Sequence, residues 1–83
     1  MATLAEIARQ RKIQLKQLLL ASRKLDAAQE TLEREVKRLV TRKQSIPEVS
    51  DAQRLIQLSR GVEGALTNMV NVITTLSGSW AAT

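Results

Sequence analysis

The sequence has no cysteine and no histidine. Disulfide bridges are therefore excluded, and the side chains that most often act as metal ligands or thiolate nucleophiles are missing. Enzymatic catalysis needs a nucleophile with a base, a pair of acids or a metal ion. Most of the carboxylates lie on one expected helix close to Lys or Arg, which is typical of a solvated ion-pair face. We therefore expect a protein without catalytic residues, metal, cofactor or small-molecule substrate.

Aromatic residues are almost absent, with one Trp and no Phe or Tyr, and Pro47 is the single proline. The apolar residues are consequently Leu, Ile, Val, Ala and Met, which are typical of packing between helices. A chain of 83 residues forms one small domain, close to the size at which a single core is only marginally stable. We expect an all-α fold in one domain over residues 1–83.

Long apolar runs are also absent, because no stretch reaches the ~18 residues that a membrane-spanning helix needs. Asn68, Asn71, Thr74 and Thr75 interrupt the best candidate. The first residues include Glu6 and lack the apolar core of a secretory signal. These features predict that the chain has neither a signal peptide nor a transmembrane helix. We therefore expect an intracellular or cytoplasmic location, or a place within an assembled particle.

Apolar or small residues recur from Leu4 to Leu39 at alternating steps of three and four. This heptad pattern predicts a long first helix that packs along one seam, over residues 3–43. The spacing of Glu30 and Arg34, and of Glu33 and Lys37, favours two ion pairs on this helix.

The first pattern stops before Pro47, which disfavours helical geometry in the residue preceding it. Two possible capping boxes, at residues 45–48 and 50–53, predict a loop at 44–48 and a second helix that begins near 49. A second heptad follows and stops near Ser77-Gly78-Ser79. We therefore expect the second helix to end at 77 and a short tail to occupy 78–83.

The two heptads fit one antiparallel hairpin, in which Leu39 lies opposite Ala52 and Leu15 opposite Leu76. The same register places Arg11 opposite Trp80, where the guanidinium can stack on the indole; the alternative is that Trp80 lies in a frayed tail or meets a partner. The expected seam consists of Leu15, Leu18, Leu25, Leu32, Val36, Leu39, Leu55, Val62, Leu66, Met69, Ile73 and Leu76.

A two-helix hairpin leaves much of this apolar surface uncovered, and uncovered apolar patches mark interaction surfaces. No charged residue follows Glu63, although a solvated surface helix normally displays charge opposite its apolar stripe. We expect other protein to cover this surface, either another copy or a different helical subunit. The expected interface residues are Ile13, Leu20, Ile56, Leu58, Ala65, Val70, Val72 and Trp80.

Gly61 and Gly64 leave an alternative open, because glycine weakens a helix interior. A break at this point would let the chain cover itself as a three-helix unit. In an unbroken helix, the same glycines form a smooth surface that another backbone can approach closely.

The chain is basic in its first half, which holds eleven of the thirteen Lys and Arg before residue 44. Several of them fall on or beside one helical column. Such a stripe can bind phosphates of a nucleic acid or an anionic membrane surface. The candidate anion contacts are Arg9, Lys16, Arg23, Lys24, Lys37 and Arg38.

The segment Val62-Glu63-Gly64-Ala65-Leu66 within a second helix resembles the needle co-chaperones of type III secretion. In shape, the chain also resembles needle subunits, small helical subunits of kinetochore rings, and phage or virus assembly proteins. The long basic first helix departs from the co-chaperones, so no functional residue is carried over.

Three functions are consistent with these features. The leading hypothesis is a non-enzymatic structural or assembly protein, for example in a viral, phage or secretion-type assembly, that self-associates or joins a complex through its apolar helix faces. The second is a basic adaptor that binds nucleic acid or an anionic surface through its first helix. The third is a small chaperone that covers a partner's helix.

Overall fold

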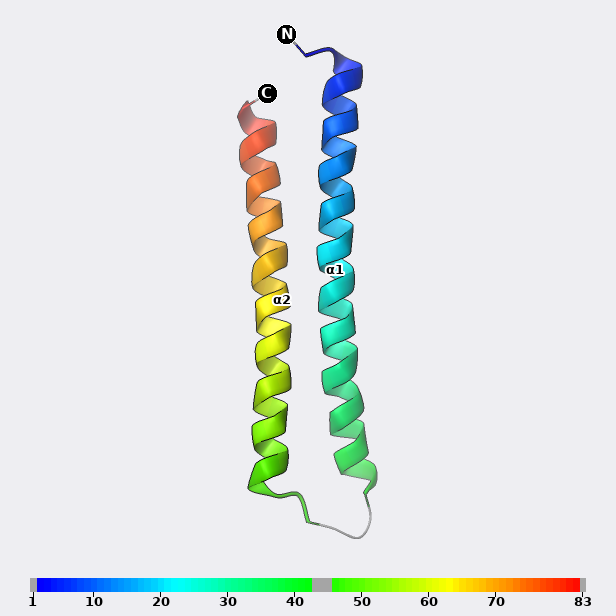
Figure 1. Ribbon diagram of the computed structural model, residues 1–83, viewed down its shortest axis with the longest axis vertical. Helices are drawn as coiled ribbons and strands as arrows, with labels where there is room; N and C mark the ends of the chain where they lie inside the picture. Colours follow the sequence, from blue (N-terminus) through cyan, green and yellow to red (C-terminus); the bar gives the residue numbers. More distant parts are fainter. Residues whose placement is uncertain (1, 43–45, 83) are drawn as a thin grey trace.

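The computed structural model describes residues 2–42 and 46–82, and these form two helices, α1 (Leu4–Thr41) and α2 (Val49–Ala82). The helices lie side by side and antiparallel, with both chain ends at one end of the molecule (Figure 1). The described residues contain no strand. The expected all-α hairpin is therefore confirmed, and it is a rod measuring 67 × 16 × 11 Å.

α1 begins where Thr3, in an extended conformation, caps the first turn. The Thr3 hydroxyl accepts a hydrogen bond from the backbone N–H of Glu6 at 3.2 Å. This contact satisfies one of the free N–H groups at the helix start, and the Glu6 carboxylate favours the positive end of the helix dipole. A threonine followed three residues later by a glutamate thus sets the first boundary.

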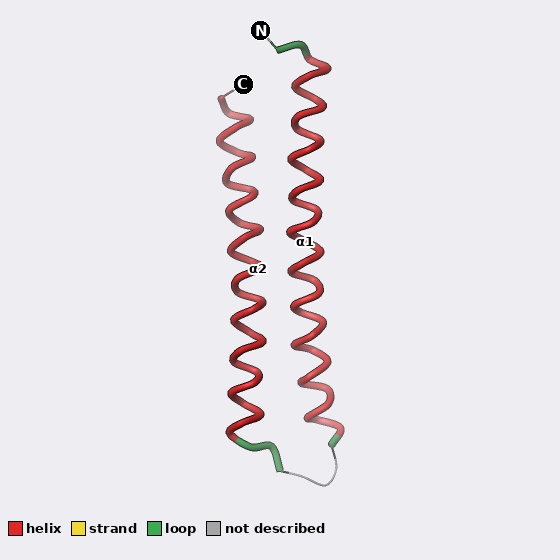
Figure 2. The backbone as a smooth tube through the Cα atoms, in the orientation of Figure 1, coloured by secondary structure: helices red, strands yellow, loops and turns green. Residues whose placement is uncertain are grey.

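The connection between the helices lies at the opposite end of the rod (Figure 2). α1 ends at Thr41, and Arg42 is extended. α2 begins after Glu48, whose backbone N–H donates to Asp51 Oδ2 at 2.9 Å. An acid in the third position of the helix therefore caps its start, and neither expected capping box supplies this bond. Residues 43–45, which include part of the expected loop, lie outside the described residues.

α2 continues through Ser77, Gly78 and Ser79 to Ala82, past the end that the sequence predicts at residue 77. The expected tail over 78–83 is thus helical as far as Ala82. Residue 83 lies outside the described residues.

Gly61 and Gly64 lie within α2 without interrupting it, and no positive φ occurs among the described residues. A two-helix hairpin therefore replaces the three-helix alternative. A Cβ atom added at either glycine would meet nothing within 4 Å, so both face open space on the outside of the hairpin.

The contact between the helices is a strip of buried and half-buried residues that recur every three or four positions, and we call these the inter-helix positions. On α1 they are Ile7, Arg11, Gln14, Leu18, Ala21, Leu25, Ala28, Leu32, Glu35 and Leu39, and on α2 Asp51, Leu55, Leu58, Val62, Ala65, Met69, Val72, Leu76 and Trp80. The strip is thin: Ala21, Leu76 and Glu35 are the most buried, at 3%, 6% and 8% exposure.

Eight of the twelve expected seam residues occupy these inter-helix positions, namely Leu18, Leu25, Leu32, Leu39, Leu55, Val62, Met69 and Leu76. The other four are each displaced by one residue. Leu15, Val36, Leu66 and Ile73 are 42–46% exposed, and the residue before each of them lies between the helices instead. Gln14 and Glu35, which take the places of Leu15 and Val36, make polar contacts with α2. Ala65, which takes the place of Leu66, lets the two backbones approach closely. A search for the largest apolar residues therefore selects the wrong adjacent column.

The outward position of Gly61 and Gly64 gives a first prediction. Gly61→Ala and Gly64→Ala should each stabilise the hairpin by up to about 1 kcal/mol, because Ala is the better helix former and open space receives its methyl group. Urea unfolding followed by circular dichroism measures the change, and Gly78→Ala, close to the end of α2, serves as a control with a smaller expected gain. A loss of stability at Gly64→Ala would instead indicate that another backbone packs against this surface.

Candidate interaction surface

Most exposed aliphatic residues lie on one side of the hairpin. Eight of them immediately follow an inter-helix position in the sequence, namely Leu15, Leu19, Val36, Val40, Ile56, Leu66, Val70 and Ile73. Each helix turns about 100° per residue in the same sense, so on either helix these residues lie on one flank of the contact. In an antiparallel pair the two corresponding flanks face the same side. We call these eight residues the exposed apolar face.

A groove at the end of the molecule that carries the chain termini connects the two helices on this side. Its volume is about 370 Å³ and its walls are almost wholly apolar. Residues of α1 and α2 both contribute to it: Leu15, Leu18, Ile73, Leu76, Ser77 and Trp80. Leu15 and Ile73 belong to different helices and line the same groove, as expected for residues on one side of the hairpin.

Trp80 closes the terminal end of this groove and is held by two residues of α1. The Arg11 guanidinium lies 5.2 Å from the centroid of the Trp80 ring, and its Nη2 donates to the Trp80 carbonyl oxygen at 3.5 Å. Trp80 Nε1 in turn donates to Gln14 Oε1 at 2.7 Å. Of the two alternatives that the sequence left open for Trp80, the structure thus has the stacking on Arg11 and not the frayed tail.

These contacts also explain why α2 does not end at Ser77. The Trp80 carbonyl belongs to the last turn of the helix, where carbonyl groups lack helical partners and favour positive charge. Arg11 supplies that charge, and Gln14 Nε2 donates to Ser79 Oγ at 3.3 Å. Side chains of α1 thus stabilise a serine- and glycine-containing turn that has a low helix propensity of its own.

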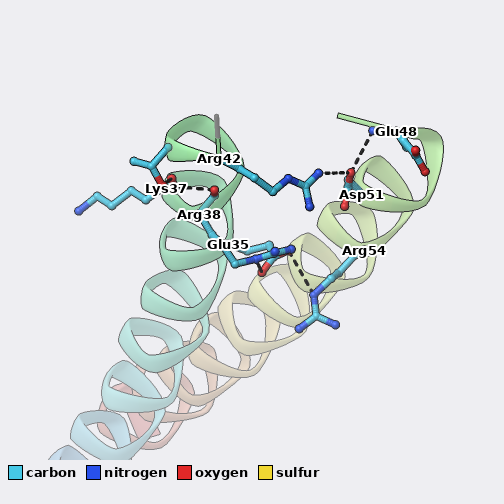
Figure 3. A network of polar contacts seen from close by, with 8 residues as sticks. Glu35, Lys37, Arg38, Arg42, Glu48, Asp51 and Arg54 are labelled. Atoms are coloured by element: carbon cyan, nitrogen blue, oxygen red, sulfur yellow. Dashed lines mark hydrogen bonds and ion pairs between the residues drawn. The ribbon is translucent and has the colours of Figure 1, made fainter. Parts of the chain in front are cut away.

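Charged residues hold the loop end of the hairpin together (Figure 3). Arg38 donates to Glu35 from Nε at 3.2 Å and from Nη2 at 2.6 Å, and Arg54 of α2 lies 3.4 Å from the same carboxylate. Arg42 Nη2 pairs with Asp51 Oδ2 at 3.1 Å. Glu35 therefore joins α1 to α2 through Arg54, and Asp51 joins α2 to Arg42, the residue that follows α1.

The surroundings of these carboxylates lower their pKa values. Hydrogen bonds from Arg38 are the main cause for Glu35, whose pKa lies below its ordinary value. The backbone N–H of Glu48 is the main cause for Asp51, with a further contribution from Arg42. Both groups are thus held in the charged form that the loop end requires.

The residues expected at the interface fall into four places. Leu58, Ala65 and Val72 lie between the helices and are half-buried, so they do not form an outer surface. Ile56 and Val70 lie on the exposed apolar face. Ile13 and Leu20 are exposed elsewhere, at 51% and 56%, on the outer side of α1, while Trp80 packs on Arg11.

The expected anion contacts divide into two groups. Lys37 pairs with Glu33 at 3.1 Å, as expected from their spacing, and Arg38 pairs with Glu35. The second expected pair, Glu30 with Arg34, is not among the ion pairs of the described residues. Arg9, Lys16, Arg23 and Lys24 are exposed, and none of them pairs with a carboxylate among the described residues.

The apolar heptad pattern did not predict several polar residues that have structural roles. Gln14, Glu35 and Asp51 occupy inter-helix positions although they are polar, and each bonds across the hairpin or caps a helix. A heptad search passes over them. Their spacing of three and four from Leu18, Leu32 and Leu55 is the signal that would have identified them.

Neither a metal site nor a membrane span is evident in the part of the chain that the structure describes. There, no three carboxylates gather as a metal ion would require, and neither helix has the length and apolar character to cross a bilayer. No protein-family model, curated protein or solved structure matches this chain. Its function must therefore be argued from its surfaces.

The Arg11–Trp80 contact predicts a measurable coupling. In a double-mutant cycle of Arg11→Gln and Trp80→Leu, the two substitutions should couple by about 0.5–1 kcal/mol, which is typical of a cation over an indole at a partly exposed site. Urea unfolding at one fixed protein concentration gives the four stabilities. The exposed Arg9→Gln replaces Arg11→Gln in the control cycle, where no coupling is expected.

The ion pairs at the loop end predict acid sensitivity. Since the folded state lowers the carboxyl pKa values, the stabilisation is complete above the ordinary value near ~4 and is lost as the pH falls through the lowered values. Glu35→Gln should lower the melting temperature at pH 7, and the difference from the unsubstituted chain should shrink as the pH is lowered toward ~2. Melting curves across this range test the prediction, with Glu30→Gln as the control. An unchanged difference at low pH would contradict it.

Proposed function

We propose that this chain is a non-enzymatic assembly subunit that self-associates through the exposed apolar face. The observation that carries the proposal is the placement of eight large aliphatic residues from both helices on one side of a thin hairpin, each 42–78% exposed. Exposed apolar surface of this kind is typical of protein–protein contacts.

The accessible surface supports the proposal. The chain exposes 6730 Å², whereas a compact monomer of its mass exposes about 4900 Å². The excess of about 1800 Å² is more than the roughly 800 Å² that each partner buries in an interface of standard size. The radius of gyration, 19.1 Å, likewise exceeds the ~12 Å of a compact domain of this length.

A second copy of the chain is the partner that best fits this surface. Two antiparallel hairpins stacked on their apolar sides form a four-helix bundle, in which each helix buries a wider stripe than a helix pair allows. Closed association of identical copies is also the commonest form of protein assembly.

Charge on the face favours one arrangement of the two copies. Asp26 and Glu63 follow inter-helix positions near the middle of each helix, so they interrupt the exposed apolar face. Full overlap of two copies would bring these carboxylates together in a partly dehydrated contact, which is unfavourable. Overlap of the terminal halves alone avoids this and buries Leu15, Leu19, Leu66, Val70 and Ile73.

Val70→Asp is the substitution that tests this interface. It should abolish association and leave the helix content largely intact, because Val70 is 50% exposed in the hairpin and its burial is required only by the assembly. Size-exclusion chromatography with multi-angle light scattering, at low and high salt, measures the association. The melting temperature of the unsubstituted chain should also rise with protein concentration.

Two matched substitutions complete this test. Val40→Asp introduces the same charge at the loop end of the same face and should weaken association much less. Val72→Asp places the charge between the helices and should reduce helix content as well. An unsubstituted chain that stays monomeric at all concentrations would contradict self-association, and a chain that is soluble only with a co-expressed protein would favour the chaperone hypothesis.

A further inference from the structure

The outer side of α1 carries a run of basic residues without opposing charge. No acidic residue occurs between Glu6 and Asp26. The exposed cations of this segment make no ion pair with any described carboxylate, and the ion pairs that the structure does contain lie in the loop half of the hairpin. The cations concerned are Arg9, Lys12, Lys16, Arg23 and Lys24.

Two aliphatic side chains lie among these cations. Ile13 and Leu20 are separated by two helical turns and are 51% and 56% exposed. Each precedes an inter-helix position by one residue, about 100° around the helix on the side away from the exposed apolar face. We call the five cations with Ile13 and Leu20 the outer stripe.

We propose that the outer stripe adsorbs onto an anionic phospholipid surface, with α1 lying parallel to it. The Lys and Arg side chains are long enough to extend toward the lipid phosphates while their methylene groups remain against the apolar layer. Ile13 and Leu20, in the middle of the stripe, would enter the boundary between headgroups and acyl chains. A helix with a basic rim and an aliphatic centre is typical of proteins that bind in the plane of a membrane.

The aliphatic residues favour a lipid surface over a nucleic acid. Exposed Ile13 and Leu20 would gain nothing from a row of backbone phosphates, because phosphate contacts are made by charged and polar groups. Single-stranded nucleic acid is bound through aromatic side chains that stack on the bases, and the only aromatic residue, Trp80, packs on Arg11 at the inter-helix contact.

Adsorption would be reversible and sensitive to salt. Each Lys or Arg near an anionic leaflet strengthens partitioning by about fivefold at physiological ionic strength, and the attraction falls off within the Debye length. The proposal does not depend on self-association, because the outer stripe lies on the outer side of α1 and only Lys12, which follows Arg11, adjoins the flank that carries the exposed apolar face.

Co-sedimentation of the full chain with vesicles tests the proposal. The chain should bind vesicles that contain phosphatidylserine, should not bind pure phosphatidylcholine, and should be released by salt. The triple substitution Arg9→Gln, Lys16→Gln and Arg23→Gln should weaken binding about 100-fold. Its charge-matched control is Arg34→Gln, Lys37→Gln and Arg60→Gln, which leaves the outer stripe unchanged and should retain most of the binding.

A second variant separates lipid from nucleic acid. Ile13→Gln with Leu20→Gln keeps the charge and should weaken vesicle binding by about tenfold. Far-UV circular dichroism establishes that each variant retains its helices. No binding to anionic vesicles at low salt, or an equal loss in the control triple variant, would overturn the proposal. Vesicle binding that is unaffected by Ile13→Gln with Leu20→Gln, together with equally tight binding of duplex DNA, would assign the stripe to nucleic acid. Light scattering without vesicles reports self-association separately, so either proposal can fail alone.

Discussion

Two helices alone have one line of contact, and this constraint governs the rest of the structure. Each helix can turn only one narrow stripe toward its neighbour, so even the most buried large apolar residue, Leu76, keeps 6% of its surface exposed. The apolar residues of this chain cover a wider arc than that stripe. The hairpin therefore has a small core and a large apolar remainder, and the exposed apolar face follows from the geometry of a helix pair with this sequence.

Polar contacts join the two helices at both ends of the rod. At the terminal end, Arg11 stacks on Trp80 and donates to its carbonyl oxygen. At the loop end, Glu35 pairs with Arg38 of α1 and Arg54 of α2, and Asp51 of α2 pairs with Arg42. Such contacts between partly exposed groups add modest stability, but their geometry fixes the register. A slide of one helix along the other would break the contacts at both ends.

The sequence was sufficient for the antiparallel hairpin, because a long heptad pattern and a proline-containing break are strong signals. It left open whether Trp80 stacks on Arg11 or lies in a frayed tail. It did not identify exactly which residues of each helix face the other helix. Leu15 belongs to the more apolar column, but the residue that lies between the helices is its neighbour Gln14, which bonds to Ser79 and Trp80 of α2. It also placed the end of α2 too early, because the propensities of Ser77 and Gly78 are overridden by contacts between Ser79, Trp80 and the distant Gln14.

The one-residue shift between the expected and observed strips changes the functional argument. Val72, expected on the outside, belongs to the hairpin itself, and Leu15 and Ile73, expected inside, belong to the surface that a second copy would cover. The same shift leaves Ile13 and Leu20 among unpaired cations on the outer side of α1. A bundle formed through the exposed apolar face would therefore carry an outer stripe on each copy. Two linked stripes would bind a charged surface far more tightly than one, so assembly and adsorption, if both occur, should reinforce each other while responding differently to salt.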